Sequence, residues 1–180
     1  SACATCDGFF YKGLDVVVVG GGDTAAEEAT YLAKLCTKVT LLVRRDEMRA
    51  SKAMQKRVFN ADNLEVLFNH ETKSINGEPG EIGVESVTAL NNITGEETII
   101  PAKGFFVAIG HTPNTNLFKD QLDMDENGYL IIEAGTSKTK IPGVFAAGDV
   151  ADHVYRQAVT SAGTGCMAAL DAERFLASQE

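Results

Sequence analysis

The first third of the chain alternates unbroken apolar runs with amphipathic stretches. Asp15–Val19 is a continuous apolar run that ends in three glycines, which predicts a buried parallel strand leading into a tight turn. The Ala-rich stretch from Asp23 to Cys36 places its apolar residues on one helix face, and Lys38–Val43 predicts a second strand. This order of strand, turn, helix and strand is the unit in which a dinucleotide-binding glycine motif works.

The alternation continues through the middle of the chain and then changes character. Ala50–Phe59 predicts a second helix and Leu64–Phe68 a third strand. Turn residues at 77–80 and 91–95 bracket the short run Ser86–Leu90. Turns on both sides of a short run predict an antiparallel meander.

Gly104–Ile109 predicts another buried strand, and polar connections dominate after it. We therefore place a domain boundary at about residue 110, which gives an α/β chain with domains 1–110 and 111–180. Glycines within a helix predict close packing against another element, and the last predicted helix contains two of them. The elements expected after the boundary are a short strand near Tyr129–Ile132, a last strand and turn over Ile141–Asp149, and a helix from Arg156 to Ser178 that holds Gly163 and Gly165.

Composition excludes several classes of protein. The formal net charge of -9 over 180 residues argues against non-specific nucleic-acid binding, and no apolar run approaches the length of a membrane span. Four cysteines do not make a secreted disulfide framework, and the start does not resemble a signal peptide. A reducing cytoplasm fits best. Because the chain opens on Ser1 rather than Met, we expect it to be a piece of a longer protein.

A glycine motif directly follows the first predicted strand. Gly20-x-Gly22-x-x-Ala25 supplies a tight turn, a close backbone approach to a pyrophosphate, and a small residue where helix meets strand. The phosphates would lie at the positive end of the helix that starts near Asp23. The alternative is a glycine turn that binds nothing. The surrounding elements favour a Rossmann-like nucleotide-binding unit.

The end of the second strand indicates which nicotinamide nucleotide is bound. Arg44 and Arg45 follow this strand and Arg49 comes one helical turn later, and guanidinium groups suit the 2′-phosphate of NADPH better than a free hydroxyl. NAD sites place an acidic residue here instead, and Asp46 or Glu47 could play that part. The three arginines favour NADPH, although a solvated basic face is the alternative.

Cys3 and Cys6 have three interpretations: a redox pair, half of a zinc site, or two ordinary turn cysteines. Two intervening residues allow a disulfide to close across one turn. Zinc needs four ligands, and the three histidines show no ligand spacing, so we expect no metal. Asp7 either moves protons during thiol exchange or caps a turn. We expect the other cysteines, Cys36 and Cys166, to be buried small hydrophobes.

Taken together, these residues resemble the low-molecular-weight, bacterial-type thioredoxin reductases from one end of the chain to the other. Alkyl hydroperoxide reductase flavoproteins share the cysteines and glycines but resemble NADH users and lack the double arginine. The segments that carry the resemblance are Cys3-Ala-Thr-Cys6-Asp7-Gly8, the run from Gly20 to Ala29, Arg44-Arg45-Asp46-x-x-Arg49-Ala50, Val107-Ala108-Ile109-Gly110, Gly143–Asp149 and Arg156-Gln157-Ala158.

The resemblance implies a cytoplasmic homodimer that passes electrons from NADPH through FAD to Cys3–Cys6, and then to thioredoxin. By the same analogy, Asp7 is the active-site acid and the three arginines bind the 2′-phosphate. Asp149 would contact the middle of FAD, and the segment from Arg156 to Ala158 its ring. The other residues that the resemblance places at the cofactors are Gly20, Gly22, Asp23, Thr24, Ala25, Ile109, Gly110, Gly148 and Gln157.

Two departures from the family pattern qualify these expectations. Val43 stands where the family usually has His. The family's FAD domain is split around the NADPH domain, and the half that would precede Cys3 is missing here. We therefore expect 111–180 to be only the C-terminal half of a split FAD-binding domain, and the 180-residue chain alone to be inactive. An NADPH-binding fragment without catalysis, or a subunit like the alkyl hydroperoxide reductase flavoprotein, are the alternatives.

Overall fold

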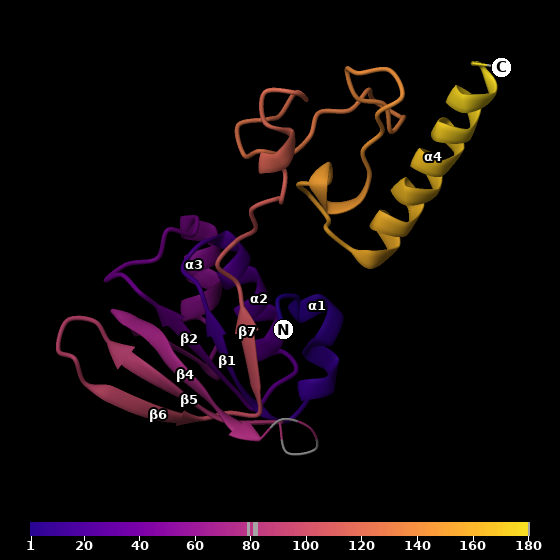
Figure 1. Cartoon of the computed structure of the whole chain (residues 1–180). Coiled ribbons are helices and arrows are strands. Elements are labelled where there is room, and N and C mark those ends of the chain that lie inside the picture. Colours follow the sequence, from indigo (N-terminus) through magenta and orange to yellow (C-terminus); the bar gives the residue numbers. More distant parts are fainter. Residues whose placement is uncertain (79, 81–82, 180) are drawn as a thin grey trace. The chain divides into compact units, whose positions relative to one another are not determined.

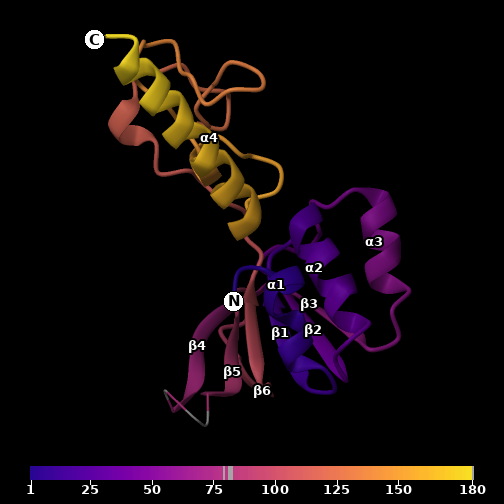
Figure 2. The same ribbon diagram turned by 90° about the vertical axis from the view of Figure 1, so that its right-hand side faces the viewer.

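The computed structural model describes residues 1–78, 80 and 83–179, which form two compact units, Ser1–Gly110 and His111–Glu180. The first unit has three layers, an antiparallel sheet, a parallel sheet and a layer of helices, which Figure 2 shows from the side. The expected α/β class, with a parallel sheet and an antiparallel meander, is confirmed.

The parallel sheet has the strand order β3-β2-β1-β7. The strand β1, Asp15–Val19, is buried on both faces, because Val16 and Val18 face the helices while Val17 faces the second sheet. Burial on both faces explains why this strand is an unbroken apolar run. The predicted bounds of the first three strands are confirmed to the residue: β1 is Asp15–Val19, β2 is Lys38–Val43, β3 is Leu64–Phe68, and β7 is Gly104–Val107.

The antiparallel sheet forms the connection between β3 and β7. It consists of β4, His70–Glu78, β5, Gly83–Asn91, and β6, Glu97–Pro101. Val87 and Ala89 of β5 pack against the parallel sheet. The predicted meander is therefore confirmed; Pro79 of its first predicted turn lies outside the described residues.

Helices cover the other face of the parallel sheet (Figure 1). They are α1, Ala4–Asp7, which continues into a 3-10 turn, α2, Asp23–Ala33, and α3, Lys52–Phe59. The apolar face of α2 packs on the sheet and is fully buried at Ala25, Ala29 and Leu32. This packing fixes the start of α2 beside the end of β1, which is where the glycines lie.

Several predicted element ends differ from the structure. The helix expected to reach Cys36 stops at Ala33, because the Asn63 side chain donates hydrogen bonds to the carbonyl oxygens of Ala33 and Cys36, at 2.9 and 3.0 Å. The next helix starts after Ser51, whose hydroxyl caps it. The strand expected over Gly104–Ile109, which is β7, ends at Val107, because its partner β1 ends at Val19, where the chain turns.

The second unit contains one long helix, α4, Ala158–Ala177, and two 3-10 turns, Asn116–Phe118 and Gly148–Val150. The strands predicted near Tyr129–Ile132 and over 141–147 do not form. Each is reduced to a single bridge, Met124 with Leu130 and Lys138 with Phe145. An apolar run forms a strand only where a neighbouring strand satisfies its backbone, and the described part of this unit provides none.

The long helix α4 buries none of its residues within its unit. The prediction that Gly163 and Gly165 pack closely is wrong for the described structure, because nothing lies within 4 Å of a Cβ built on either glycine. Cys166, expected to be buried, is exposed for the same reason. Among the described residues, no helix is both long and apolar enough to cross a membrane.

Candidate functional site

The glycine turn is set by a close approach between β1, α2 and the end of β7. Gly20 has φ of 149°, and a Cβ built on it would lie 2.3 Å from the carbonyl oxygen of Ala108 and 2.7 Å from the Cβ of Ala25. No larger residue fits there. Ala25 is itself fully buried. Its role in the structure is to fill the junction of helix and strand, rather than to line a cavity.

Gly22 serves a different purpose from Gly20. It occupies the N-cap position of the 11-residue helix α2 in an extended conformation, and no side chain caps the helix. Nothing lies within 4 Å of a Cβ built on Gly22. The space beside the start of α2 is therefore open, as a phosphate group approaching a helix N-terminus requires.

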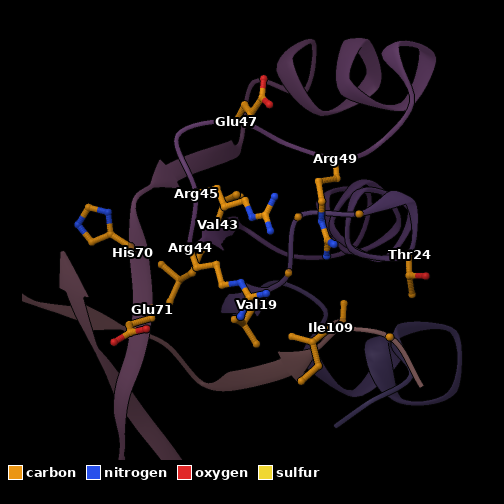
Figure 3. A pocket seen from close by; sticks show the side chains of 16 residues that line it. Val19, Thr24, Val43, Arg44, Arg45, Glu47, Arg49, His70, Glu71 and Ile109 are labelled. Atoms are coloured by element: carbon orange, nitrogen blue, oxygen red, sulfur yellow. The ribbon is translucent and has the colours of Figure 1, made fainter. Parts of the chain in front are cut away.

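A cavity of about 360 Å³ opens in front of this turn, at the carboxyl ends of β1, β2 and β7. This is where ligands bind in open α/β sheets. Figure 3 shows side chains that line it. The predicted cofactor residues that the structure brings together here are Gly20, Gly22, Thr24, Arg44, Arg45, Arg49, Ile109 and Gly110.

The three arginines enter this cavity from one loop, and their guanidinium groups lie toward its middle (Figure 3). Backbone hydrogen bonds hold the loop. The Asn92 side chain donates to the Arg44 carbonyl oxygen at 2.7 Å, and the Asn69 amide donates to that of Arg45 at 2.9 Å. The Arg49 amide donates to the Gly21 carbonyl oxygen at 2.7 Å. The positive charge is thereby fixed beside the glycine turn.

The acidic residues near the arginines point elsewhere. The Asp23 carboxylate accepts a hydrogen bond from the Ser51 amide at 2.9 Å, so it ties the arginine loop to α2 and lies outside the cavity lining. Glu47 belongs to the lining, but its carboxylate is directed away from the guanidinium groups (Figure 3). Asp46 does not belong to the lining. The charged groups directed toward the middle of the cavity are the guanidinium groups of the three arginines (Figure 3).

His70 and Glu71 also line the cavity, and sequence reasoning missed both as site residues. They begin β4, which passes the cavity after the chain leaves β3. The Nδ1 atom of His70 lies 2.6 Å from the Phe68 carbonyl oxygen, so this nitrogen is the donor and carries a proton. Figure 3 shows that the His70 ring is directed away from the three arginine side chains.

The redox candidates lie in α1. Cys3 and Cys6 form a disulfide with their Cα atoms 5.3 Å apart. Cys6 is exposed and Cys3 half-buried, and Asp7 ends the helix, also half-buried. Ala4, between the cysteines, is 1% exposed and packs in the same apolar cluster as α2. The turn is therefore anchored through Ala4 while Cys6 remains accessible.

The other two cysteines differ from each other. Cys36 is buried, as expected, and burial raises the pKa of its thiol to about 11. A thiol of this pKa is inert at neutral pH. Cys166 is exposed on α4. Within the part of the chain that the structure describes, no group of three or more His, Cys, Asp or Glu residues is placed to hold a metal ion.

The residues expected at FAD lie around the start of α4. Gly148 donates its amide to the Thr164 hydroxyl at 3.0 Å, and the exposed Asp149 accepts from the Ser161 hydroxyl at 3.0 Å. Arg156 has φ of 50° and donates its guanidinium to the His153 carbonyl oxygen. Gln157 is the N-cap of α4 and Ala158 its first residue. The structure brings these five residues together at one helix end.

Asp152 fixes the approach to this helix. Its carboxylate accepts hydrogen bonds from the amides of Val154, Tyr155 and Arg156 and from the Thr160 hydroxyl, at 2.8 to 3.1 Å. Burial raises the pKa of this carboxyl group, and the backbone and hydroxyl hydrogen bonds outweigh it, so that the pKa is lowered. Asp152 was not predicted from the sequence, since its role depends on the local turn.

Replacement by alanine should have different effects at Gly20, where it lowers stability, and at Gly22, where it weakens nucleotide binding. Gly20→Ala should destabilise the 180-residue chain by at least about 2 kcal/mol, because the added methyl group collides with Ala108 and Ala25. Gly22→Ala should cost under about 1 kcal/mol as an N-cap change, yet weaken NADPH binding about tenfold by occupying the phosphate approach. Urea unfolding and calorimetry measure both. Unchanged NADPH affinity in Gly22→Ala would contradict a phosphate site at this turn.

Comparison with known proteins identifies the family. Residues 1–165 match the model of the pyridine nucleotide-disulphide oxidoreductases. The chain is 54% identical to a thioredoxin reductase of Streptomyces clavuligerus, over 99% of this chain and 54% of that protein. It is also 54% identical to the NADPH-dependent thioredoxin reductase 3 of Arabidopsis thaliana, over 99% of this chain and 34% of that protein.

A solved structure shows the same fold. The thioredoxin reductase of Streptococcus pyogenes superposes with a TM-score of 0.89 at 39% identity, and the match covers 99% of this chain and 57% of that one. The chain spans about half the length of the Streptomyces and Streptococcus proteins. The resemblance to thioredoxin reductases that was inferred from the motifs is confirmed.

Proposed function

The chain belongs to the pyridine nucleotide-disulphide oxidoreductase family, and from this premise we propose that it acts as a thioredoxin reductase. In this proposal two electrons pass from NADPH, by way of FAD, to the Cys3–Cys6 disulfide and then to the disulfide of thioredoxin. The observation that carries the proposal is that one compact unit holds both an arginine-lined dinucleotide cavity and an accessible Cys-x-x-Cys disulfide.

The choice of NADPH rests on the arginine loop. Arg44, Arg45 and Arg49 all line the cavity, and together they match the charge of a 2′-phosphate. A hydroxyl at the 2′ position would leave the guanidinium groups without a matching charge. The nucleotide phosphates would lie at the start of α2, next to Gly22.

The FAD part of the proposal rests on the second unit. Asp149 offers an exposed carboxylate and Arg156 a guanidinium group to a flavin dinucleotide, beside the positive end of α4. When bound, FAD supplies the chemistry that joins two-electron hydride donors to thiol–disulfide exchange. We propose that these residues hold part of it, because the polar groups at this helix end suit a ligand with phosphates and ring heteroatoms.

The disulfide is proposed to act through two exchange reactions. In the reduced protein, the more exposed Cys6 thiolate attacks the thioredoxin disulfide; that bond breaks, a mixed disulfide forms, and the released thiolate takes up a proton. Cys3 then loses its proton and attacks Cys6, which restores the Cys3–Cys6 disulfide and releases the second thioredoxin thiolate, which is protonated in turn. Two electrons and two protons reach thioredoxin. Asp7 is proposed to carry a proton between these steps.

Two exposed aromatic residues near the disulfide support the proposal that a protein binds there. Phe9 and Phe10 directly follow α1 and are 69% and 77% exposed. Adjacent aromatic side chains that remain exposed on a folded surface mark an interaction site. Because they lie within four residues of Cys6, they suit a partner whose own disulfide must meet this sulfur.

Phe9→Ser combined with Phe10→Ser should raise the KM for thioredoxin about tenfold or more in the full-length protein with FAD, because each buried aromatic anchor contributes of the order of 1–3 kcal/mol to an interface. Reduction of a small, readily reduced disulfide such as 5,5′-dithiobis(2-nitrobenzoate) should be unchanged. Steady-state NADPH oxidation measures both. Absence of NADPH-dependent thioredoxin reduction by the unmodified protein would contradict the proposed function itself.

The assembly and location of the protein stay predictions. The resemblance predicts a homodimer in the cytoplasm. The NADH-dependent alternative, a subunit like the alkyl hydroperoxide reductase flavoprotein, is disfavoured by the double arginine at the cavity.

A further inference from the structure

A charged residue lies in the middle of a buried apolar helix face. On α2, Ala25, Ala29 and Leu32 are fully buried, and Glu28 falls between them on the same face at helical spacing. Its Oε2 atom is buried and has no hydrogen-bond partner in the described structure. Because unpartnered buried polar atoms are rare and unfavourable, this one calls for an explanation.

The element that covers this face is the helix of the disulfide. Ala4, which lies between the two cysteines, is buried in the same cluster, and its backbone amide favours the charged form of Glu28 and acts to lower the pKa of that carboxyl group. A Cβ built on Gly8 would lie 3.0 Å from Leu32, so the chain after α1 also packs on this face. Glu28 therefore lies on the helix face against which the Cys-x-x-Cys turn packs.

The other charged residues of the two helices are Asp7 of α1 and Asp23 and Glu27 of α2. Asp23 and Glu27 are both exposed. Burial raises the pKa of Glu28, while the Ala4 amide and the Ser1 amino group act in the opposite direction. Partial burial also weakens solvent screening between this carboxylate and any charge that forms on the neighbouring turn.

We propose that Glu28 is a positioning residue of the redox site, which sets the acidity and the reduction potential of the Cys3/Cys6 dithiol. Reduction breaks the S–S bond, takes up two electrons and yields two thiolates, which become thiols by taking up two protons. A carboxylate beside them disfavours the thiolate form and raises the thiol pKa. The reduced form is then less stable above this pKa, so the dithiol is a stronger reductant.

This inference rests on the proposed function in one respect, namely that the Cys3–Cys6 disulfide is redox-active. It gives a reason for the unpartnered oxygen: the charge is kept next to the dithiol although burial makes it unfavourable. A reductase that must deliver electrons to another protein's disulfide benefits from a low potential.

The test compares Glu28→Gln with Glu27→Gln in the 180-residue chain, in a Cys166→Ser background that removes the exposed third thiol. Both variants remove one negative charge from α2. Glutamine retains the size of Glu28 and an oxygen that can accept a hydrogen bond. The dithiol is prepared with dithiothreitol, and the rate of iodoacetamide reaction at Cys3 and Cys6 is followed against pH by peptide mass spectrometry.

Glu28→Gln should raise the thiolate fraction about tenfold below the reaction midpoint, because a carboxylate within a few ångströms shifts a neighbouring pKa by about one unit. At pH above both thiol pKa values, the reduction potential of the Cys3/Cys6 couple, measured in dithiothreitol buffers, should be about 30 mV higher in Glu28→Gln than in the parent. This is the equivalent of the tenfold change for two electrons. Glu27→Gln should match the parent in both measurements. Equal midpoints for the two variants would overturn the proposal.

A measurement on the unmodified side chains covers the case in which Glu28→Gln does not fold. In the reduced chain labelled with ¹³C at glutamate carboxyl carbons, the Glu28 resonance should show an inflection at the dithiol midpoint that is absent in the oxidised chain and from Glu27. Lack of this inflection would also overturn the proposal. Neither measurement uses NADPH, FAD or thioredoxin, so failure of the proposed enzymatic activity would leave both results readable.

Discussion

Replacing Cys3 by serine should abolish NADPH-dependent reduction of thioredoxin by the full-length protein. Reduction of a disulfide takes two electrons, and the Cys3/Cys6 pair can deliver both only when both thiols are present. Cys6, the remaining thiol of this pair, cannot by itself reform the Cys3–Cys6 disulfide that the structure shows. We expect the rate to fall by at least about a thousandfold, which corresponds to about 4 kcal/mol in the barrier. The assay follows NADPH oxidation at saturating thioredoxin disulfide.

The matched control for this variant is Cys166→Ser. It removes an exposed cysteine that belongs to no disulfide, and the rate should be that of the parent. Flavin absorbance should be retained in both variants, which separates loss of exchange from loss of the cofactor. A Cys3→Ser protein that still turns over thioredoxin would mean that another group accepts the electrons.

Replacing Arg44 and Arg45 together by alanine should weaken NADPH binding by at least about a hundredfold and NADH binding by less than about threefold. Each charge-assisted contact to a phosphate contributes roughly 1.5–3 kcal/mol, and each 1.4 kcal/mol is about tenfold in affinity. Only NADPH carries the 2′-phosphate that these side chains suit. Calorimetry of the 180-residue chain with the two nucleotides measures the difference.

Lys56→Ala with Arg57→Ala is the control, because it also removes two positive charges from an exposed surface nearby, on α3. These residues do not belong to the cavity lining, so both affinities should change little. An equal loss of NADPH and NADH in the Arg44 and Arg45 variant would show that the arginines merely hold the loop.

The first unit could be predicted closely from the sequence because its signals are local. A strand buried on both faces must be apolar throughout, so β1 was recognisable from Val16 to Val19 without knowledge of its neighbours. The glycine turn, the arginines and the cysteines each lie within one short segment. Helix ends were less predictable, since the end of α2 depends on Asn63, a residue about thirty positions away.

The second unit was harder to predict, because its apolar runs form strands or pack only where neighbouring elements lie beside them. The apolar run near Phe145 predicts a strand, but the described part of its unit contributes only one bridge to it. Likewise Cys166 and the glycines of α4 were expected to be packed, and within this unit nothing covers them. A pattern of apolar residues indicates that a surface is suited to burial, and whether it is buried depends on what lies beside it.

The candidate site shows the same contrast. Its arginines could be predicted from spacing, whereas His70 and Glu71 reach the cavity only through the path of β4. Glu28 left a signal that was available, a charge between Ala25 and Leu32 on an otherwise apolar face. Its significance required knowledge of the element that packs there, which is the disulfide turn itself.

The most direct test of the account is an anaerobic titration of the full-length protein with FAD, in which newly formed thiols are mapped after each addition of NADPH. The account predicts that thiols appear at Cys3 and Cys6, while buried Cys36 stays unlabelled, and that thioredoxin disulfide then removes them in equal amount. NADPH consumption with the Cys3–Cys6 disulfide intact, or thiols that thioredoxin disulfide does not reoxidise, would contradict it.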